Sequence, residues 1–430
     1  MTLKLNAIFI LVMSVFVISC NQNKKAEKEM PTRKQVSAKE ILGNPEYLAI
    51  SYGGYRKKSR DSQPSLQELK NDLKILSAMG IKVIRTYNVQ VPLPHASNIL
   101  KAIDELNKED ANFEMYVMLG AWIDCLNAWT GQPVNHDVES PGNAAEIARA
   151  VVLANQYPDI VKVIAVGNEA MVKWAESYYV QPNIILKWVN HLQGLKQLDR
   201  LPKDLWITSS DDFASWGGGE DFYHVEDLEN LVKAVDYISM HCYPYHNTHY
   251  NPQFWGVPDS EEQLSDKEKV DAAMKRAVQF SKKQYDSVTN YMKSLGVNKP
   301  IHIGETGWAT TSKGFYGING SKATDEYKQG LYYKMMREWT NSNNISCFYF
   351  EAFNEQWKDA EHPNGSENHF GLFTIDGKAK YPIWDLVDQG VFEGLTRNGN
   401  PITKTYNGDK EALMKQVLVP PALNDIMAHR

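Results

Sequence analysis

The chain has 430 residues, of which 43% are hydrophobic and 23% are charged. These fractions are typical of a globular protein with a large core, and one α/β barrel can fill a chain of this length. The net charge of −6 at pH 7 argues against the basic surface that nucleic-acid binding usually requires. We expect a monomeric protein with no nucleic-acid partner.

The first twenty residues have the pattern of an export signal. Lys4 precedes a short apolar run at 7–17, which is too short to span a bilayer as a stable anchor. The run ends in VISC at 17–20, which resembles a bacterial lipobox. This resemblance implies cleavage before Cys20 and lipidation of its thiol. A plain signal peptide with a chance cysteine is the alternative.

A polar tether is expected after the lipidated cysteine. Residues 20–44 include the charged, aromatic-free run NQNKKAEKEMPTR, which is typical of a flexible linker. Asn21 stands where lipoproteins retained in the inner membrane commonly carry aspartate. We therefore expect a signal peptide at 1–19, a tether at 20–44, and attachment to the bacterial outer membrane through the lipid alone.

From about Tyr47 the sequence alternates short β-rich runs with helical stretches, which is typical of βαβ units. Eight strands are predicted, at Tyr47–Tyr52, Lys82–Tyr87, Phe113–Leu119, Val161–Val166, Leu205–Thr208, Tyr237–Met240, Ile301–Gly304 and Cys347–Phe350. The clearest helices are predicted at Leu66–Met79, Asn143–Asn155, Ile184–Leu195, Lys267–Leu295 and Thr324–Thr340. Eight repeats favour the α/β class with a closed (β/α)8 TIM barrel, in a single catalytic domain at 45–396. Residues 397–430 are expected to form a surface appendage.

Two glutamates follow apolar runs at predicted strand ends, Glu169 at the fourth strand and Glu305 at the seventh. Active sites of α/β barrels lie at these ends, and retaining glycosidases need two carboxyl groups about 5–5.5 Å apart. We assign Glu305 as nucleophile and Glu169 as acid/base, and we expect Asn168 to contact the sugar 2-hydroxyl. The alternative is a pair of structural glutamates that cap strand ends or form ion pairs.

Four motifs resemble the family 17 glycoside hydrolases, the β-1,3-glucanase family. They are VGNE at 166–169, GETGW at 304–308, FNEQWK at 353–358 and ENHFGLF at 367–373. The resemblance implies a barrel, retaining chemistry on β-1,3-glucan and no metal or other cofactor. It places the acid/base on Glu169, the nucleophile on Glu305, and auxiliary site residues on Glu355, Lys358 and Glu367. The long segments 209–223 and 241–258 depart from compact members of the family and leave the linkage preference open.

Further substrate contacts are expected in the segments that follow the strands. Tyr52 ends the first predicted strand, and Arg85 and Tyr87 end the second. An arginine beside the nucleophile would keep it ionised, although a structural ion pair is an equal alternative. Tyr243 is a candidate donor to the nucleophile or to a sugar hydroxyl, and Trp308 a candidate floor for a sugar ring, with core packing as its alternative.

The cysteines and histidines do not indicate a metal centre. Cys125, Cys242 and Cys347 have spacings that suggest no disulfide framework, so we expect buried thiols. His246 and His249 follow Cys242 in a loosely metal-like cluster, but the intervening Tyr-Pro gives no regular ligand spacing.

The resulting hypothesis is a retaining endo-β-1,3-glucanase that hydrolyses laminarin-like glucan. A β-1,3-glucan transglycosylase uses the same intermediate and passes the glycosyl group to a sugar instead of water. A non-catalytic surface glycan-binding lipoprotein is a third hypothesis, although both carboxylates are present.

Overall fold

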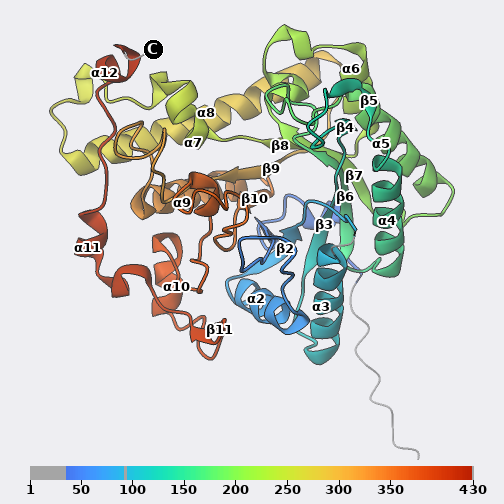
Figure 1. Ribbon diagram of the computed structural model, residues 1–430, viewed down its shortest axis with the longest axis horizontal. Coiled ribbons are helices and arrows are strands. Elements are labelled where there is room, and N and C mark those ends of the chain that lie inside the picture. The colour runs from blue at the N-terminus through green and yellow to red at the C-terminus, as the bar shows by residue number, and fades with distance from the viewer. Residues whose placement is uncertain (1–34, 92–93, 429–430) are drawn as a thin grey trace, which may run out of the picture. The chain divides into compact units, whose positions relative to one another are not determined.

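The computed structural model describes residues 35–91 and 94–428, so the predicted signal peptide and Cys20 lie outside the described residues. Eight parallel strands close into a barrel in the order β1-β10-β9-β8-β7-β6-β3-β2 (Figure 1). They are β1 (Leu48–Ser51), β2 (Ile81–Arg85), β3 (Tyr116–Ala121), β6 (Val161–Asn168), β7 (Trp206–Asp212), β8 (Ile238–His241), β9 (Ile301–Gly307) and β10 (Cys347–Phe350). The eight predicted strands and the (β/α)8 fold are confirmed.

Helices alternate with the strands along the chain. The longer ones are α2 (Leu66–Ala78), α3 (His95–Glu109), α4 (Asn143–Gln156), α5 (Pro182–Gln197), α6 (Glu226–Ala234), α8 (Asp266–Ser294) and α9 (Glu326–Ser342). The shorter ones are α1 (Ala38–Ile41), α7 (Pro244–Tyr250), α10 (Trp384–Asp388), α11 (Lys410–Met414) and α12 (Leu423–Ala428). Ser65 caps the start of α2, because its hydroxyl accepts from the backbone N–H of Glu68 and the Glu68 carboxylate accepts from Ser65 in return.

Two small antiparallel sheets accompany the barrel. The hairpin of β4 (Cys125–Leu126) and β5 (Asn135–Glu139) is inserted between β3 and α4, and β11 (Thr396–Arg397) pairs with β12 (Asn400–Pro401) near the C-terminus. The barrel strands are buried almost throughout, since helices cover their outer faces and side chains fill the interior. The three described cysteines are buried and free, as predicted. Within the described part of the chain, no helix is both long and apolar enough to cross a bilayer.

The predicted domain boundaries are wrong at both ends of the barrel. Val36, Ile41 and Leu42, which were expected in the tether, are buried in a cluster with strand residues such as Ala49 and Val83. Residues of these strands alternate between a cluster shared with the helices and this second cluster, so α1 packs onto the side chains that fill the barrel. A few apolar residues in a polar stretch are enough to fold it onto the core.

The expected C-terminal appendage is likewise part of the same compact unit, which spans 35–430. Arg397 is fully buried, as are most of Ile402 and Leu413. The hydroxyl of Thr405 donates to Glu326 on α9 at 2.6 Å. The short elements of this segment made it look peripheral in the sequence, but their contacts fix it to the barrel.

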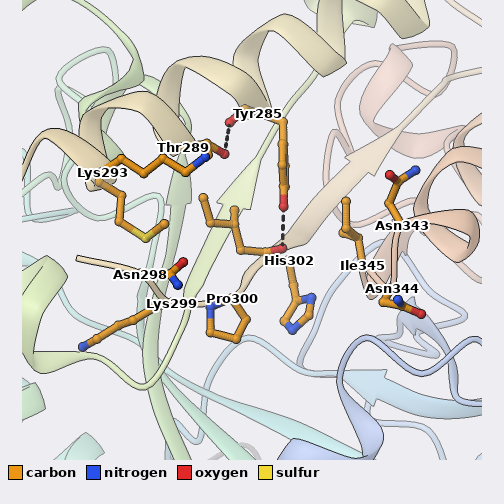
Figure 2. A pocket seen from close by; sticks show the side chains of 12 residues that line it. Tyr285, Thr289, Lys293, Asn298, Lys299, Pro300, His302, Asn343, Asn344 and Ile345 are labelled. Atoms are coloured by element: carbon orange, nitrogen blue, oxygen red, sulfur yellow. Dashed lines mark hydrogen bonds between the residues drawn. The ribbon is translucent and has the colours of Figure 1, made fainter. Parts of the chain in front are cut away.

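A cavity of about 310 Å³ lies at the N-terminal end of β9, between α8 and the end of α9 (Figure 2). Tyr285, His302 and Asn343 line it, and the hydroxyl of Tyr285 donates to the carbonyl of Ile301 at 3.4 Å. Burial lowers the pKa of His302 to about 3, so the imidazole is neutral at ordinary pH. This cavity is at the opposite end of β9 from Glu305, so it is separate from the carboxyl pair.

Candidate active site

Glu169 and Glu305 lie at the C-terminal ends of the fourth and seventh barrel strands, as predicted. Glu169 directly follows β6, and Glu305 is in the last half of β9. Glu169 has φ 46° and Gly167 has φ 82°. A left-handed conformation costs a non-glycine residue roughly 1–3 kcal/mol and persists only where surrounding structure fixes it. Here the N–H of Glu169 donates to the carbonyl of Ser210 at 3.0 Å, which joins the turn to β7.

Gly304 allows the strands to come together beneath Glu305. A Cβ at this position would lie 2.1 Å from the hydroxyl oxygen of Ser239 and 2.5 Å from that of Ser210. No real Cβ is found so close to another atom, so a side chain here would push β9 away from β7 and β8.

Three predicted side chains converge on the carboxylate of Glu305. Arg85 Nη1 donates to Oε2 at 2.5 Å, and the hydroxyl of Tyr87 donates to the same oxygen at 2.9 Å. The hydroxyl of Tyr243 donates to Oε1 at 2.6 Å. Arg85 Nη2 also donates to Oδ1 of Asn168 at 2.5 Å, which ties the two strand ends together. Both oxygens of Glu305 are therefore held by donors that favour the ionised form.

Glu169 has a different set of partners. Its Oε1 lies 3.0 Å from Nδ1 of His241, and Nε2 of that imidazole lies 2.8 Å from the hydroxyl oxygen of Ser210. A neutral imidazole has one donor and one acceptor, and a hydroxyl can act as either. The contact from His241 can therefore persist while Glu169 gains or loses its proton.

One oxygen of Glu169 and one of Glu305 lie within 4.8 Å of each other. Their side chains are 16% and 9% exposed, so both remain accessible from solvent. With His241 they form the one group in the described part of the chain whose ligand atoms could surround a metal ion. The guanidinium of Arg85 would repel a cation at Glu305, which favours carboxyl chemistry at this site.

The environments of the two carboxyl groups shift their pKa values in opposite directions. Burial raises the pKa of Glu169 to about 8, and the negative charge of Glu305 adds to this increase. Burial also acts to raise the pKa of Glu305, but the positive charges of His241 and Arg85 and two tyrosine hydrogen bonds lower it overall. Burial lowers the pKa of His241 to about 4, so Arg85 is the cation that persists at neutral pH. The pair thus combines a carboxylic acid with a carboxylate.

A second group of charged residues follows β10. Lys358 Nζ forms an ion pair with Glu351 and lies 3.5 Å from Oε2 of Glu355. Oε1 of Glu355 accepts from the backbone N–H of Tyr55 at 3.0 Å, which joins the loop after β1 to the loop after β10. The structure therefore brings the two predicted residues, Glu355 and Lys358, together. Burial acts to lower the pKa of Lys358, but the negative charges of Glu351, Glu355 and, to a smaller extent, Glu305 raise it overall.

Glu367, the third residue of this group that the family resemblance predicted, stands in a short 3-10 helix at Ser366–Asn368. It is half-buried, and its negative charge contributes to the raised pKa of Glu169. Its charge also acts to raise the pKa of Tyr245 and that of His246, both near the start of α7, although burial has the larger effect on each. Glu367 therefore acts on the acid/base through its charge, whereas the described donors to Glu305 are Arg85, Tyr87 and Tyr243.

Two predicted sugar contacts are wrong. Trp308 is completely buried, its indole N–H donates to the carbonyl of Ala323 at 2.8 Å, and its ring packs against Trp255. It has no free face for a sugar. Tyr52 is 1% exposed and its hydroxyl donates to Asp72 on α2 at 3.0 Å. Both side chains point into the packing between the barrel and its surrounding elements.

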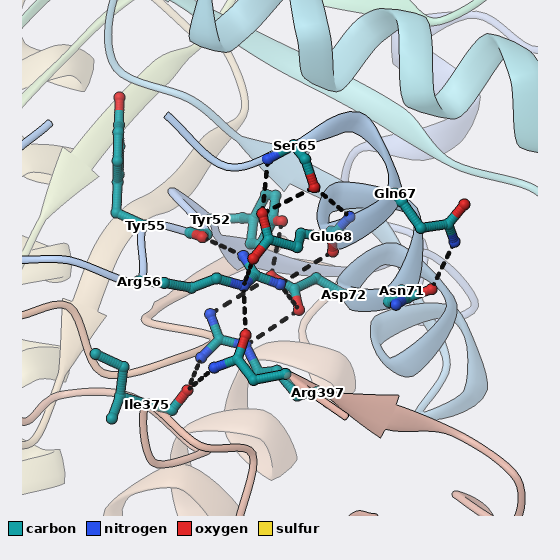
Figure 3. A network of polar contacts seen from close by, with 12 residues as sticks. Tyr52, Tyr55, Arg56, Ser65, Gln67, Glu68, Asn71, Asp72, Ile375 and Arg397 are labelled. Carbon is teal, nitrogen blue, oxygen red and sulfur yellow. Dashed lines mark hydrogen bonds and ion pairs between the residues drawn. The ribbon is translucent and has the colours of Figure 1, made fainter. Parts of the chain in front are cut away.

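A buried polar network anchors the loop after β1 (Figure 3). Asp72 accepts from Arg56 Nη2 at 2.8 Å and from Arg397 Nε at 3.1 Å, in addition to the Tyr52 hydroxyl. Arg56 Nη1 donates in turn to the carbonyl of Gly54 at 2.6 Å. Asp72 therefore connects α2, the loop after β1, and the C-terminal sheet.

Replacing Asp72 with alanine is expected to lower the free energy of unfolding by roughly 3–5 kcal/mol, because it leaves two buried guanidinium groups without a shared carboxylate. Urea unfolding at pH 7 measures this change. Asp61→Ala, an exposed aspartate in the same loop, is the control and should change stability by about 0.5 kcal/mol or less. Equal stability of the two variants would contradict the structural role of Asp72.

His241 and Glu351 are site residues that the sequence reasoning did not assign. Both stand at the end of a barrel strand, His241 as the last residue of β8 and Glu351 directly after β10. Burial raises the pKa of Glu351 to about 8, and among the described residues its Oε1 has no hydrogen-bond partner. The position after a strand was the available signal, but it does not tell whether a side chain faces the mouth of the barrel.

Comparison with known proteins identifies the family. Residues 49–371 match the model described as the BtgE/BtgC glycoside hydrolase domain. A crystal structure of an endo-laminarinase from Formosa Hel1_33_131 is 70% identical with a TM-score of 0.89, over 90% of this chain and 98% of that chain.

More distant relatives have related names. A glucan 1,3-beta-glucosidase from Arthroderma benhamiae is 25% identical over 279 residues, which is 62% of this chain and 70% of the relative. A putative glucan endo-1,3-beta-glucosidase, btgC, from Aspergillus niger is 23% identical over 313 residues, which is 71% of this chain but 37% of the relative. The chain belongs to the BtgE/BtgC glycoside hydrolase family, in agreement with the family 17 resemblance of its motifs.

Proposed function

We propose that the protein is a retaining endo-β-1,3-glucanase that hydrolyses laminarin-like β-glucan through a covalent glycosyl-enzyme. The observation that carries this proposal is the carboxyl pair, whose oxygens lie within 4.8 Å and whose pKa values are shifted in opposite directions. Retaining enzymes hold their carboxyl groups about 5–5.5 Å apart, whereas inverting enzymes need about 6.5–9.5 Å to admit a water molecule. The observed spacing supports double displacement.

In the first step the Glu305 carboxylate attacks the anomeric carbon, and the bond from that carbon to the departing sugar oxygen breaks. Glu169 is protonated below about pH 8 and gives its proton to that oxygen. Arg85 keeps Glu305 ionised before attack, and Asn168, held by Arg85, can donate its amide N–H to the 2-hydroxyl of the same sugar. The products of this step are a glycosyl ester on Glu305 and a free reducing-end fragment.

In the second step the ionised Glu169 removes a proton from water, whose oxygen attacks the anomeric carbon. The ester bond to Glu305 breaks and its carboxylate is restored. Tyr87 and Tyr243 then donate again to both oxygens of Glu305, which stabilises it as a leaving group. His241 is a positioning residue, since it contacts Glu169 and not the reacting sugar.

Two observations support the substrate class. The Formosa protein at 70% identity is described as an endo-laminarinase, and almost its whole length is covered. The Arthroderma and Aspergillus relatives are named as 1,3-β-glucosidases. This chain spans 37% of the Aspergillus protein, so the comparison with it concerns the hydrolase domain alone.

Measurements of reducing ends and chain lengths on β-1,3-, mixed-linkage and β-1,4-glucans test the proposal. We expect an early fall in the chain length of β-1,3-glucan and the release of short oligosaccharides. Preferential cleavage of β-1,4-glucan would contradict the substrate class, and release of terminal glucose alone would contradict endo action. Products longer than a short β-1,3-oligosaccharide substrate would identify the transglycosylase instead, and binding without new reducing ends would identify a glycan-binding protein.

We also propose that Cys20 anchors a monomeric enzyme to the outer membrane through its lipid. The VISC sequence at 17–20 and the Asn21 that follows support this location. Expression of the full chain in a bacterium fed an alkyne fatty acid should label the protein and place it in the outer-membrane fraction. Cys20→Ser should lose both properties, and labelling that persists in this variant would contradict the proposal.

A further inference from the structure

We propose that Trp122, Trp129 and Tyr178 form an aromatic platform that binds the leaving half of the glucan chain, on the reducing-end side of the cleaved bond. This inference rests on the proposed function and deepens it by assigning a binding site for one half of the substrate. The ligand class is a β-linked glucose oligosaccharide, whose rings present C–H groups on their faces.

The three rings form one contiguous surface. The centroids of Trp129 and Tyr178 are 5.1 Å apart with an angle of 24° between the rings, and those of Trp122 and Tyr178 are 5.2 Å apart. Trp129 is 63% exposed although it contacts two other rings. Aromatic rings with free faces suit the C–H face of a pyranose, and small-molecule sites are commonly lined with them.

The platform lies beside the acid/base. Trp122 directly follows β3, whose last residue, Ala121, is paired with Val166 of β6, three residues before Glu169. Burial raises the pKa of Tyr178, and the negative charge of Glu169 is the next largest contribution. The hydroxyl of Tyr178 is therefore within electrostatic reach of the group that protonates the departing oxygen.

This position selects one half of the substrate. Glu169 gives its proton to the oxygen that leaves with the reducing-end half. The first sugar of that half must therefore lie next to Glu169. A second aromatic pair, the buried Tyr55 and the partly exposed Trp357 at a centroid distance of 5.6 Å, is carried by the loops after β1 and β10. β10 is paired with β9, the strand of Glu305. This pair thus follows a strand next to that of the nucleophile, whereas the platform follows β3, the strand next to that of the acid/base, where the leaving half begins.

The platform is held in place before any substrate binds. Its hairpin carries two non-glycine residues in the left-handed region, Asn127 at φ 67° and Trp129 at φ 64°. Such residues cluster where surrounding structure imposes a conformation for function. The backbone N–H of Cys125 on β4 donates to the carbonyl of Tyr178 at 3.1 Å, which joins the hairpin to the loop that follows Glu169. The ordering of Trp129 therefore does not have to occur on binding.

The test compares a substrate whose leaving half is an oligosaccharide with a substrate whose leaving group is fluoride. The leaving group of laminarihexaose is a sugar chain, which can stack on the platform. The leaving group of β-laminaribiosyl fluoride is a fluoride ion, which has no ring to stack. Trp129→Ala should lower kcat/KM for the hexaose by roughly tenfold or more, the factor that about 1.4 kcal/mol of lost binding produces. The same variant should leave kcat/KM for the fluoride unchanged. Trp129→Phe keeps a ring and should restore most of the activity on the hexaose.

Each alternative result has a distinct meaning. Leu198→Ala removes a side chain that is 68% exposed after α5 and should alter neither substrate. An equal loss on both substrates, or no loss on the hexaose, would overturn the platform. A wild-type enzyme that cleaves neither substrate would instead overturn the proposed function. Thermal unfolding of each variant confirms that the fold is retained.

Discussion

Glu305→Gln is expected to reduce kcat on β-1,3-glucan by about four orders of magnitude or more, the scale on which removal of a catalytic nucleophile acts. The amide cannot form the glycosyl ester, although it has the size of the carboxylate. The amide is also uncharged, so Arg85 and the two tyrosines lose the carboxylate that accepts their hydrogen bonds in the wild type. Release of reducing ends, with extended incubation for the variant, measures the loss.

A trapping experiment identifies the nucleophile independently of rate. A 2-deoxy-2-fluoro-β-laminaribioside with a good leaving group slows both steps, so the glycosyl-enzyme accumulates. The mass of the wild-type protein should rise by one glycosyl group, located on Glu305 by peptide mapping. Glu338→Gln, an exposed glutamate on α9, is the control and should label as the wild type does. A label on Glu351, or full activity in Glu305→Gln, would contradict the assignment.

The positions of the two glutamates could be predicted because barrel geometry leaves little freedom there. Parallel strands all end at one face, so a polar residue after an apolar run must lie at that face whatever the loops do. Arg85 and Tyr243 follow the same logic, and both reach Glu305. The strand positions were equally robust, since each is a short run buried on both sides.

The direction of a side chain in a loop could not be predicted. Trp308 and Trp129 both follow barrel strands along the chain, yet the first is wholly buried and the second is 63% exposed. The difference is tertiary: Trp308 packs beneath α7, whereas the β4–β5 hairpin carries Trp129 outward. Tyr52 likewise turned to Asp72, a partner that lies in α2. Contacts of this kind depend on elements far apart in the sequence.

Glu169→Gln is expected to lower kcat/KM on β-1,3-glucan by roughly 10²–10⁴-fold, the usual contribution of a general acid. A sugar alkoxide is a poor leaving group and needs the proton, whereas fluoride leaves without one. The same variant should therefore retain kcat/KM for β-laminaribiosyl fluoride, because that constant reports only the first step. Its kcat should still fall, since no base activates water in the second step. Added azide needs no base and should restore kcat while forming a β-glycosyl azide.

The pH dependence distinguishes Glu169 from its neighbours. The wild type needs Glu169 protonated, so kcat/KM on glucan should hold below pH 8 and be lost as the pH rises through the pKa of about 8. It also needs Glu305 ionised. Because the pKa of Glu305 is lowered, the loss of kcat/KM at acidic pH should occur only below pH 4.5. Glu226→Gln, an exposed charge on α6, should reproduce the wild-type profile.

Titration of Glu351 is the alternative explanation for a loss of activity at alkaline pH, because burial raises its pKa to about 8 as well. On the fluoride substrate, wild-type kcat/KM should show no alkaline loss if Glu169 is the titrating acid, since its proton is not needed. On glucan, Glu351→Gln should keep the alkaline loss, because Glu169 is still present to titrate. An alkaline loss that survives on fluoride and vanishes in Glu351→Gln would assign the limb to Glu351 and remove the acid role from Glu169. The two substrates thus distinguish a residue that transfers its proton to the leaving oxygen from a residue whose proton only changes the charge of the site.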